Sequence, residues 1–176
     1  MGCHFVLQKK QGTDGRVTCF KAHLVVQGFS QWEGIDYSET FTPVVKSASL
    51  QVFLAISARH GWRIRQINIK SAYLNGVLSE VIYMLQLKGY KEKGSKEKVA
   101  KLRKGLYRLK QAGWEWYTTL HDFLVHLGFC RTHSDHSVFI FERGPLTVII
   151  PVYVDDKLLA GNDKEALNSI QNTISS

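Results

Sequence analysis

The stretch VYVDDKLLAG, residues 152 to 161, places two adjacent carboxylates, Asp155 and Asp156, between two apolar runs. Two apolar runs joined by a short polar turn are typical of a β-hairpin. Because side chains alternate in direction along strands, we expect at least one carboxylate to point into a pocket beside the first strand. Two negative charges this close repel each other unless a proton or a cation neutralises them. Their oxygens suit Mg²⁺, although most adjacent aspartates are simply solvated turn residues.

The segments around this hairpin alternate between patterns typical of strands and patterns typical of helices. Residues 4–9 and 16–27 flank a turn-like QGTDG and predict a hairpin in a small β lobe. Ser47 or Ser49 is a candidate N-cap for the next element. Helices are expected at 47–61, 113–128 and 162–176, and strands at 62–70 and in three pieces over 137–161. This order predicts an α+β fold, with an antiparallel sheet packed on helices.

The composition indicates one globular domain, or one domain with a small lobe. The chain has 176 residues, 44% of them hydrophobic, which is enough for a core. No apolar run reaches the roughly 18 residues of a membrane-spanning helix, and the start lacks the pattern of a signal peptide. We therefore expect a soluble, intracellular protein with no membrane partner. Cys3, Cys19 and Cys130 lie far apart and are expected to be ordinary thiols.

The positive charge is concentrated in residues 88–110, which hold ten Lys or Arg against two Glu. This excess equals the whole formal net charge of +8. Such a concentration is typical of a surface that binds a nucleic-acid backbone. A solvated, flexible lysine loop is the alternative, and for Lys91 to Lys98 both interpretations stay open. From Lys101 onward, apolar residues alternate with the charges and favour an ordered element with a basic face.

Six stretches carry a resemblance to a known family, in order and at similar spacing. They are KAHLVVQGFSQWEGIDYSETFTPVVK (21–46), QINIKSAYLNG (66–76), IYMLQLKGY (82–90), LYRLKQAGWEWY (107–117), GFCRTHSDHSVFI (128–140) and YVDD (153–156). Together they resemble the reverse transcriptase domain of copia-type LTR retrotransposons, a part of the Pol polyprotein. The resemblance implies a right-hand polymerase, with fingers and palm segments interleaved in a single domain over 1–176. It also implies that the thumb is absent and would follow the last residue.

The resemblance further implies the metal ligands. Two Mg²⁺ ions, or Mn²⁺ as an alternative, would be held by three aspartates, of which two match Asp155 and Asp156. The third falls on Asn68, which has the size of aspartate without its charge. Even indirect changes around a metal cost roughly 10- to 100-fold, so the loss of a direct carboxylate ligand should cost at least the upper end of that range. We therefore expect very low polymerase activity.

Other site residues follow from the same resemblance. Tyr73 would exclude a 2′-hydroxyl, and Gln111 would contact the incoming nucleotide. Without the family, Tyr73 reads as a half-buried aromatic residue and Gln111 as a polar helix start. The implied nucleotide-binding set is Lys21, His23, Ser71, Ala72, Tyr73 and Gln111, and the implied primer-template set is Tyr153, Val154, Lys101, Arg103, Lys104 and Lys110.

Two more departures from the family pattern bear on activity. His23 stands where the family has an arginine for the triphosphate, and a neutral imidazole is a poorer phosphate partner than a guanidinium. Arg108 stands in place of a glycine, and a positive φ there would add strain of about 1 kcal/mol or more. His133 and His136, which flank Asp135, together with His121 and His126 on the preceding helix, allow a zinc site, but the family match favours packing or surface roles.

These observations predict an RNA-directed DNA polymerase domain of a copia-type retrotransposon, in a degenerate copy with weak or no activity. The alternative is a non-catalytic nucleic-acid-binding remnant of the polyprotein, or a fragment that barely folds. The expected partners are an RNA or DNA template with its primer, dNTPs and other parts of the polyprotein. The family implies a location in cytoplasmic virus-like particles, with the nucleus as the alternative.

Overall fold

The computed structural model describes residues 1–91, 94 and 97–175. Lys93 and Lys96 of the basic segment lie outside these residues. The chain divides into two compact units, each built from two separate stretches of sequence. Unit 1 comprises Met1–Phe41 and Tyr73–Trp116, and unit 2 comprises Thr42–Ala72 and Tyr117–Ser176. The structure is a mixed α and β fold with antiparallel sheets, which confirms the expected fold class at this level.

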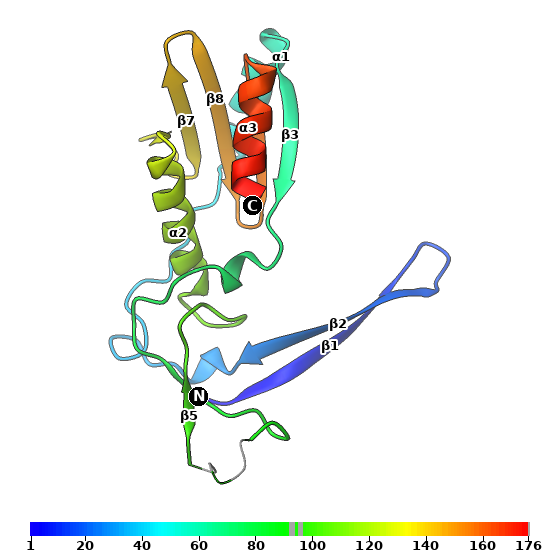
Figure 1. The fold of residues 1–176 in the computed structure, drawn as a ribbon, viewed down its shortest axis with the longest axis vertical. Helices are drawn as coiled ribbons and strands as arrows, with labels where there is room; N and C mark the ends of the chain where they lie inside the picture. Colours follow the sequence, from blue (N-terminus) through cyan, green and yellow to red (C-terminus); the bar gives the residue numbers. More distant parts are fainter. Residues whose placement is uncertain (92–93, 95–96, 176) are drawn as a thin grey trace. The chain divides into compact units, whose positions relative to one another are not determined.

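Unit 1 contains two separate two-stranded antiparallel sheets. The first is a long hairpin of β1 (Cys3–Gln11) and β2 (Val17–Val26), which confirms the hairpin expected from the sequence (Figure 1). The second pairs β4 (Tyr83–Leu85) with β5 (Val99–Lys101), and the sequence analysis did not anticipate it. Unit 1 also contains the 3-10 helix η1 (Gly28–Ser30). Its buried core consists of Val26, Ile82, Met84, Leu109 and Ala112.

The segment that follows β5 is held in place without being regular. Between Lys101 and Ala112 it contains neither a helix nor a strand, but its basic residues are exposed whereas Leu109 is buried, so the expected basic face is present on an irregular segment. Backbone hydrogen bonds hold it instead: Gly105 donates to the carbonyl of Gly76, and Val26 donates to that of Tyr107. Two features prevent a helix or strand from forming here. Gly105 packs closely on the backbone of Tyr73, and Arg108 has a φ of 70°.

The positive φ of Arg108 meets the condition for strain that was set from the sequence. For a residue other than glycine, this left-handed conformation costs about 1–2 kcal/mol. The site is also crowded, because a Cβ atom at Gly28 would collide with the Arg108 carbonyl. The exposed Arg108 therefore holds a conformation that suits glycine better.

We expect Arg108→Gly to raise the free energy of unfolding by about 1 kcal/mol, which corresponds to a melting temperature higher by about 2–4 °C. Thermal unfolding followed by circular dichroism measures this. Arg103→Gly is the control, since Arg103 is also exposed but lacks a positive φ. Arg103→Gly should lower the free energy of unfolding. If Arg108→Gly lowers it as well, the argument that Arg108 is strained is refuted.

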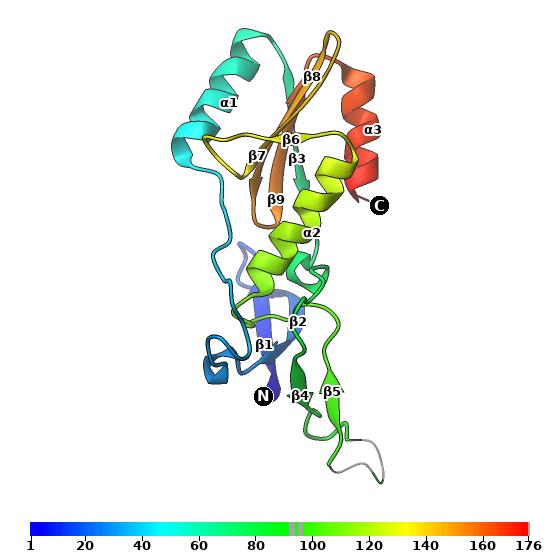
Figure 2. The ribbon, with the colours of Figure 1, turned by 90° about the vertical axis from the view of Figure 1, so that its left-hand side faces the viewer.

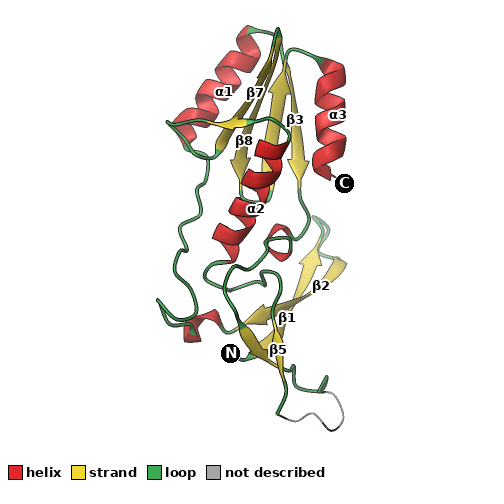
Figure 3. Ribbon diagram, turned by 60° about the vertical axis from the view of Figure 1, so that its left-hand side comes forward, coloured by secondary structure: helices red, strands yellow, loops and turns green. Residues whose placement is uncertain are grey.

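Unit 2 is built on a five-stranded antiparallel sheet in the order β3-β9-β8-β7-β6. Helices α1 and α3 lie on opposite sides of this sheet (Figures 2 and 3). Helix α2 (Ala112–His126) begins in unit 1 and continues into unit 2. The bounds are α1 (Ser47–Arg59), β3 (Arg63–Asn68), the 3-10 helix η2 (Ala72–Leu74), β6 (Cys130–Arg131), β7 (Val138–Arg143), β8 (Leu146–Tyr153), β9 (Asp156–Gly161) and α3 (Lys164–Ser175).

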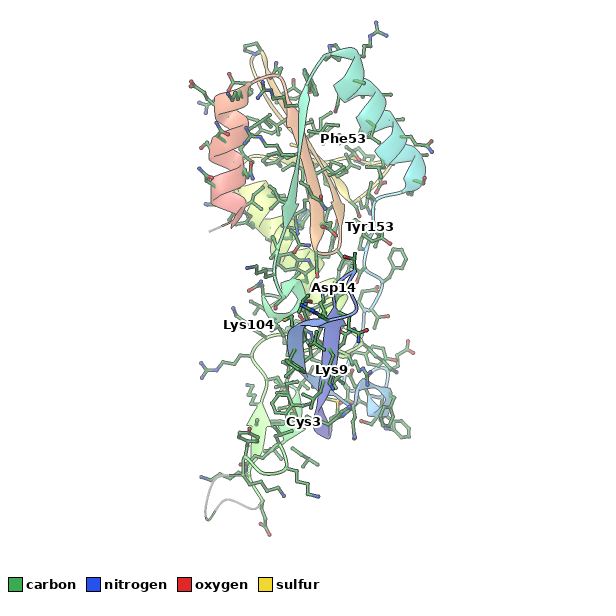
Figure 4. All side chains as sticks on the ribbon, turned by 90° about the vertical axis from the view of Figure 1, so that its right-hand side faces the viewer. Cys3, Lys9, Asp14, Phe53, Lys104 and Tyr153 are labelled. Atoms are coloured by element: carbon green, nitrogen blue, oxygen red, sulfur yellow. The ribbon has the colours of Figure 1, made fainter. Side chains whose placement is uncertain are left out.

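Both faces of the central strands are buried, which explains the nearly unbroken apolar run of β8. On one face, Ile149 and Ala160 pack with Phe53 of α1, a residue labelled in Figure 4. On the other face, Val148 and Leu159 have no exposed surface. A strand covered on both sides does not alternate between apolar and polar residues. The three strands expected over 137–161 and the three expected helices are confirmed.

A distant carboxylate caps the start of α1. The N-cap residue is Lys46, whose own side chain makes no capping bond, so the expectation of Ser47 or Ser49 as the cap was wrong. Instead the backbone N–H of Lys46 donates to Oδ2 of Asp135 at 2.8 Å, and that of Ser137 donates to Oδ1 at 3.0 Å. Burial favours the neutral acid, but these bonds, with one from the Ser49 hydroxyl, hold the pKa of Asp135 below its usual value.

We expect Asp135→Ala to lower the free energy of unfolding by about 2 kcal/mol at pH 7, because two backbone N–H groups lose their acceptor. Since the folded pKa is lowered, this stabilisation is present above the unfolded pKa of about 4 and is lost as the pH falls through the folded pKa. Denaturant unfolding at several pH values should show the two proteins converging in acid. Asp122→Ala removes an exposed carboxylate on α2 and should cost little.

The described part of the chain contains no helix whose length and hydrophobicity would let it cross a membrane.

Candidate catalytic site at the tip of the β8–β9 hairpin

A two-residue turn joins β8 to β9 and carries the first of the two aspartates. Tyr153 pairs with Asp156 across the hairpin, so Val154 and Asp155 form the turn. Val154 has a φ of 52°, whereas Asp155 does not have a positive φ. A positive φ at the first turn position alone matches a type II′ turn, which normally takes glycine there. Strain of about 1–3 kcal/mol at such a residue is characteristic of functional sites.

Asp156 faces two side-chain amides of the neighbouring strand. The antiparallel register of β3 and β9 sets Asn68 directly opposite Asp156. The Asn68 amide donates to Oδ1 of Asp156 at 3.1 Å, and the Gln66 amide donates to the same oxygen at 2.9 Å. The bond from Asn68, followed by that from Gln66, lowers the pKa of Asp156 below its usual value. Asp156 is thus an ionised carboxylate at neutral pH.

Asp155 lies in a different environment, only one residue away. Its Oδ1 is buried, and no described residue donates a hydrogen bond to it. Burial raises the pKa of Asp155, the positive charge of Lys157 opposes this rise, and the charge of Asp156 adds to it. A buried carboxylate oxygen without a donor is costly in an otherwise satisfied structure. Such an oxygen is a suitable ligand for a cation.

Lys157, which the sequence analysis did not single out, places a positive charge beside the aspartates. Its side chain is only 1% exposed. The ammonium donates to the backbone carbonyls of Val154 at 3.4 Å and Asp155 at 3.2 Å, and so supports the strained turn from within. Burial lowers the pKa of Lys157 to about 8, although both aspartates oppose this shift. Lysine is rarely buried so fully, and its place within the apolar strand of KLLAG was the available sequence signal.

We expect the stability of the native protein to rise with pH between about 8 and about 10.5, because the unfolded chain binds more protons there than the folded one. Lys157→Met removes this dependence. The difference in unfolding free energy between the native chain and this variant should therefore change by on the order of 3 kcal/mol across that pH range. Urea unfolding at pH 7.5, 9 and 10.5 measures it. The exposed Lys164→Met is the control and should show no such change. If the difference in unfolding free energy between the native chain and Lys157→Met stays constant from pH 7.5 to 10.5, the buried charge of Lys157 is contradicted.

The donors at the hairpin tip fit one divalent cation better than two. Asp155 and Asp156 offer carboxylate oxygens, one of them buried without a donor, and such ligands suit Mg²⁺ or Mn²⁺ with waters completing the shell. Asn68 adds an amide without negative charge, so the tip offers two carboxylates and no third. Within the described residues, no group of three or more His, Cys, Asp or Glu side chains could hold a metal.

The zinc site that the sequence allowed at His133 and His136 therefore has no support among these residues. Asp135, which lies between them, instead accepts hydrogen bonds from the backbone N–H groups of Lys46 and Ser137.

Four of the expected nucleotide-binding residues lie in unit 1, namely Lys21, His23, Tyr73 and Gln111, and two of them share an aromatic neighbour. His23 contacts the ring of Tyr107 edge-on, with 4.8 Å between centroids, and Tyr73 contacts it likewise at 6.2 Å. Lys21 projects from the same face of β2 as His23, since the two are separated by one residue. Tyr73 is half-buried, as its reading without the family had it, but it lies in the 3-10 helix η2 and not at the end of a strand.

Gln111 is fully buried at the start of α2, where internal hydrogen bonds occupy its side-chain amide. Its oxygen accepts from the amide of Gln31 at 2.9 Å, and its nitrogen donates to the carbonyl of Asp36 at 2.8 Å. Lys110 is exposed, and its ammonium donates to the hydroxyl of Tyr37 at 3.0 Å and lies above that ring. The structure thus brings both residues together with the loop that follows β2.

The remaining expected residues divide between the two units. In unit 2, Ser71 is exposed with a φ of 56°, Ala72 is buried, and Tyr153 is 59% exposed at the hairpin tip (Figure 4). In unit 1, the side chains of Lys101, Arg103 and Lys104 are exposed. These three residues therefore have the solvent access that binding to a nucleic-acid backbone requires.

Comparison with known proteins identifies the family. The model of the family described as reverse transcriptase (RNA-dependent DNA polymerase) matches residues 1–176. Over 175 residues the chain is 41% identical to the retrovirus-related Pol polyprotein from transposon RE1 of Arabidopsis thaliana, covering 99% of the chain and 12% of that protein. It is 39% identical over 175 residues to the corresponding polyprotein from transposon RE2 of the same plant, covering 99% of the chain and 12% of that protein.

A third relative is the retrovirus-related Pol polyprotein from transposon TNT 1-94 of Nicotiana tabacum, which is 38% identical over 175 residues, covering 98% of the chain and 13% of that protein. The chain therefore belongs to the reverse transcriptase family, and it corresponds to that domain of copia-type Pol polyproteins, as its motifs indicated. It spans about an eighth of the length of these relatives. No solved structure matches it.

Proposed function

We propose that residues 1–176 form a single reverse transcriptase domain for RNA-directed DNA synthesis, with unit 1 as its fingers and unit 2 as its palm. The interleaving of the two units along the chain supports this division. So does the carboxylate pair at a hairpin tip of an antiparallel sheet in unit 2. Family membership supports a template with its primer, dNTPs and other polyprotein parts as partners. The same reasoning favours cytoplasmic particles as the location, with the nucleus as the alternative.

In this proposal the residues of the hairpin tip hold the reacting groups. Asp155 and Asp156 would bind a divalent cation, which would lower the pKa of the primer hydroxyl and offset phosphate charge. Tyr153 and the turn at Val154 would support the primer end. In the same proposal Tyr73 would contact the sugar, the backbone of Ser71 and Ala72 would face the triphosphate, and Lys21 and His23 would lie near its charge.

We further propose that this chain polymerises weakly or not at all, because Asn68 replaces a carboxylate. The observation that carries this is the 3.1 Å bond in which the Asn68 amide donates to Asp156. A carboxylate at position 68 would instead repel Asp156 and require a cation between them. The nearby ammonium of Lys157 acts in the same direction as Asn68, because it makes the tip less negative and less attractive to a divalent cation.

We expect Asn68→Asp to raise primer extension on an RNA template by roughly 100-fold with Mg²⁺, since it restores a direct carboxylate ligand. Gel analysis of extended primers measures the rate. Asn168→Asp, an exposed change on α3, adds the same charge away from the site and should have no effect. Rapid extension by the native chain would refute the role given to Asn68.

A second candidate function is nucleic-acid binding without catalysis. The exposed basic side chains of Lys101, Arg103 and Lys104 favour it. The extension experiment separates the two functions when template-primer binding is measured in parallel by fluorescence anisotropy. If neither the native chain nor Asn68→Asp extends the primer while both bind it with salt-dependent affinity, the binding function is the better description.

A further inference from the structure

Unit 2 has a basic hollow at the end of its sheet opposite the β8–β9 turn. Its volume is about 260 Å³, and nothing in the family match assigns it a role. It lies where β3 begins, β9 ends and α3 begins, because Arg63 pairs with Gly161 there. The lining side chains include His60, Trp62, Arg63, Arg65 and Lys164. We call this site the basic hollow.

The charge of the basic hollow is strongly positive. Arg63, Arg65 and Lys164 line it, and none of its lining residues is acidic. Asp163 and Glu165 flank Lys164 in the sequence, but Asp163 accepts the backbone N–H of Ala166 at 2.7 Å and so caps α3. Among the described residues, no carboxylate forms an ion pair with Arg63 or Lys164. Both side chains are therefore available to an anionic ligand.

Arg65 is partly fixed, which gives the basic hollow a defined wall. One of its guanidinium nitrogens donates to Oε1 of Gln171 on α3 at 2.8 Å. The remaining N–H groups of a guanidinium form a planar fork that matches phosphate oxygens. An anchored arginine loses less side-chain entropy on binding than one that moves freely.

An aromatic pair forms the other wall. The rings of His60 and Trp62 are stacked, with 5.4 Å between centroids and 29° between planes. Trp62 packs into the core on the α1 side of the sheet, whereas His60 is exposed. A fixed aromatic surface beside positive charge is the combination that single-stranded nucleic-acid sites use, where bases stack and phosphates pair with Lys and Arg.

We propose that the basic hollow binds single-stranded nucleic acid, with a phosphate between Arg63 and Lys164 and a base stacked on His60. The volume suits about one nucleotide, since drug-sized ligands occupy roughly 300 Å³ or more. Arg63 and Asn68 are five positions apart on β3, a distance of about 17 Å along the strand. The basic hollow is thus distinct from the aspartate pair, and binding there needs neither metal nor dNTP.

The test follows the indole N–H signal of Trp62 in the ¹⁵N-labelled full chain, assigned with Trp62→Phe. Titration with 5′-phosphorylated tetrathymidylate, without divalent ions or dNTPs, should shift this signal. Arg63→Gln and Lys164→Gln should each weaken that binding by about fivefold, the effect of one lost charge at an exposed site. Arg143→Gln is the matched control, because it removes an exposed arginine at the end of another strand. It should bind like the native chain.

Three outcomes would overturn the proposal. The first is a Trp62 signal that does not respond to the oligonucleotide, and the second is a response of equal size in Arg63→Gln and in the native chain. A tetraglutamate peptide that shifts the signal when tetrathymidylate does not would assign the hollow to an acidic protein segment. Circular dichroism spectra of all variants check that the fold is retained. Because no polymerisation is measured, the result is independent of whether the proposed catalysis is correct.

Discussion

The register between β3 and β9 is the constraint on which the candidate site depends. It sets position 68 opposite Asp156, on the same face of the sheet and within hydrogen-bonding distance. A shift by one residue would turn every side chain of β3 to the other face, and the buried Ile67 would be exposed. The burial of Ile67 therefore fixes which side chain meets Asp156. The identity of that side chain then decides whether the pair is satisfied internally or needs a cation.

The two aspartates differ chemically although they are neighbours in the chain. Asp156 belongs to a strand and receives two amide donors, whereas Asp155 belongs to the turn and has a buried oxygen. The ammonium of Lys157 lies beneath that turn, on the opposite face of β9 from Asp156, because side chains alternate. One short hairpin thus presents one stabilised carboxylate, one destabilised carboxylate and an internal positive charge.

Much of the fold could be predicted because its signals are local. The two apolar runs that flank the polar turn of VYVDDK, and the helical periodicity of residues 47–61 and 113–128, depend on nearby residues alone, and the structure agrees with both. The short strands β4 and β5 were missed because three residues are too few to show a period. The cap of α1 was missed because its acceptor, Asp135, is 89 residues away from Lys46.

The candidate site likewise has residues that a sequence motif predicts and residues that only the packing of the fold reveals. Asp155, Asp156 and Asn68 could be named from the sequence because a motif carries them, and the structure sets Asn68 opposite Asp156. Whether Arg108 has a positive φ could not be predicted, because that angle belongs to the folded chain. The buried state of Lys157 and the basic hollow depend on how β3, β9 and α3 pack, so no short motif identifies them. The apolar neighbours of Lys157 in KLLAG are a signal of burial, but a lysine beside two aspartates reads as a surface residue until the packing on both faces of its strand is known.

The cap provided by Asp135 has a consequence for the order in which unit 2 opens. One carboxylate holds both the first turn of α1 and the residues that lead into β7, and the N–H of Val45 is bonded to the β8 carbonyl of Val152. These segments cannot fray separately without losing shared hydrogen bonds. The entrance of α1 and the start of β7 therefore form one cooperative unit in hydrogen exchange, with similar opening free energies, although they are far apart in the sequence.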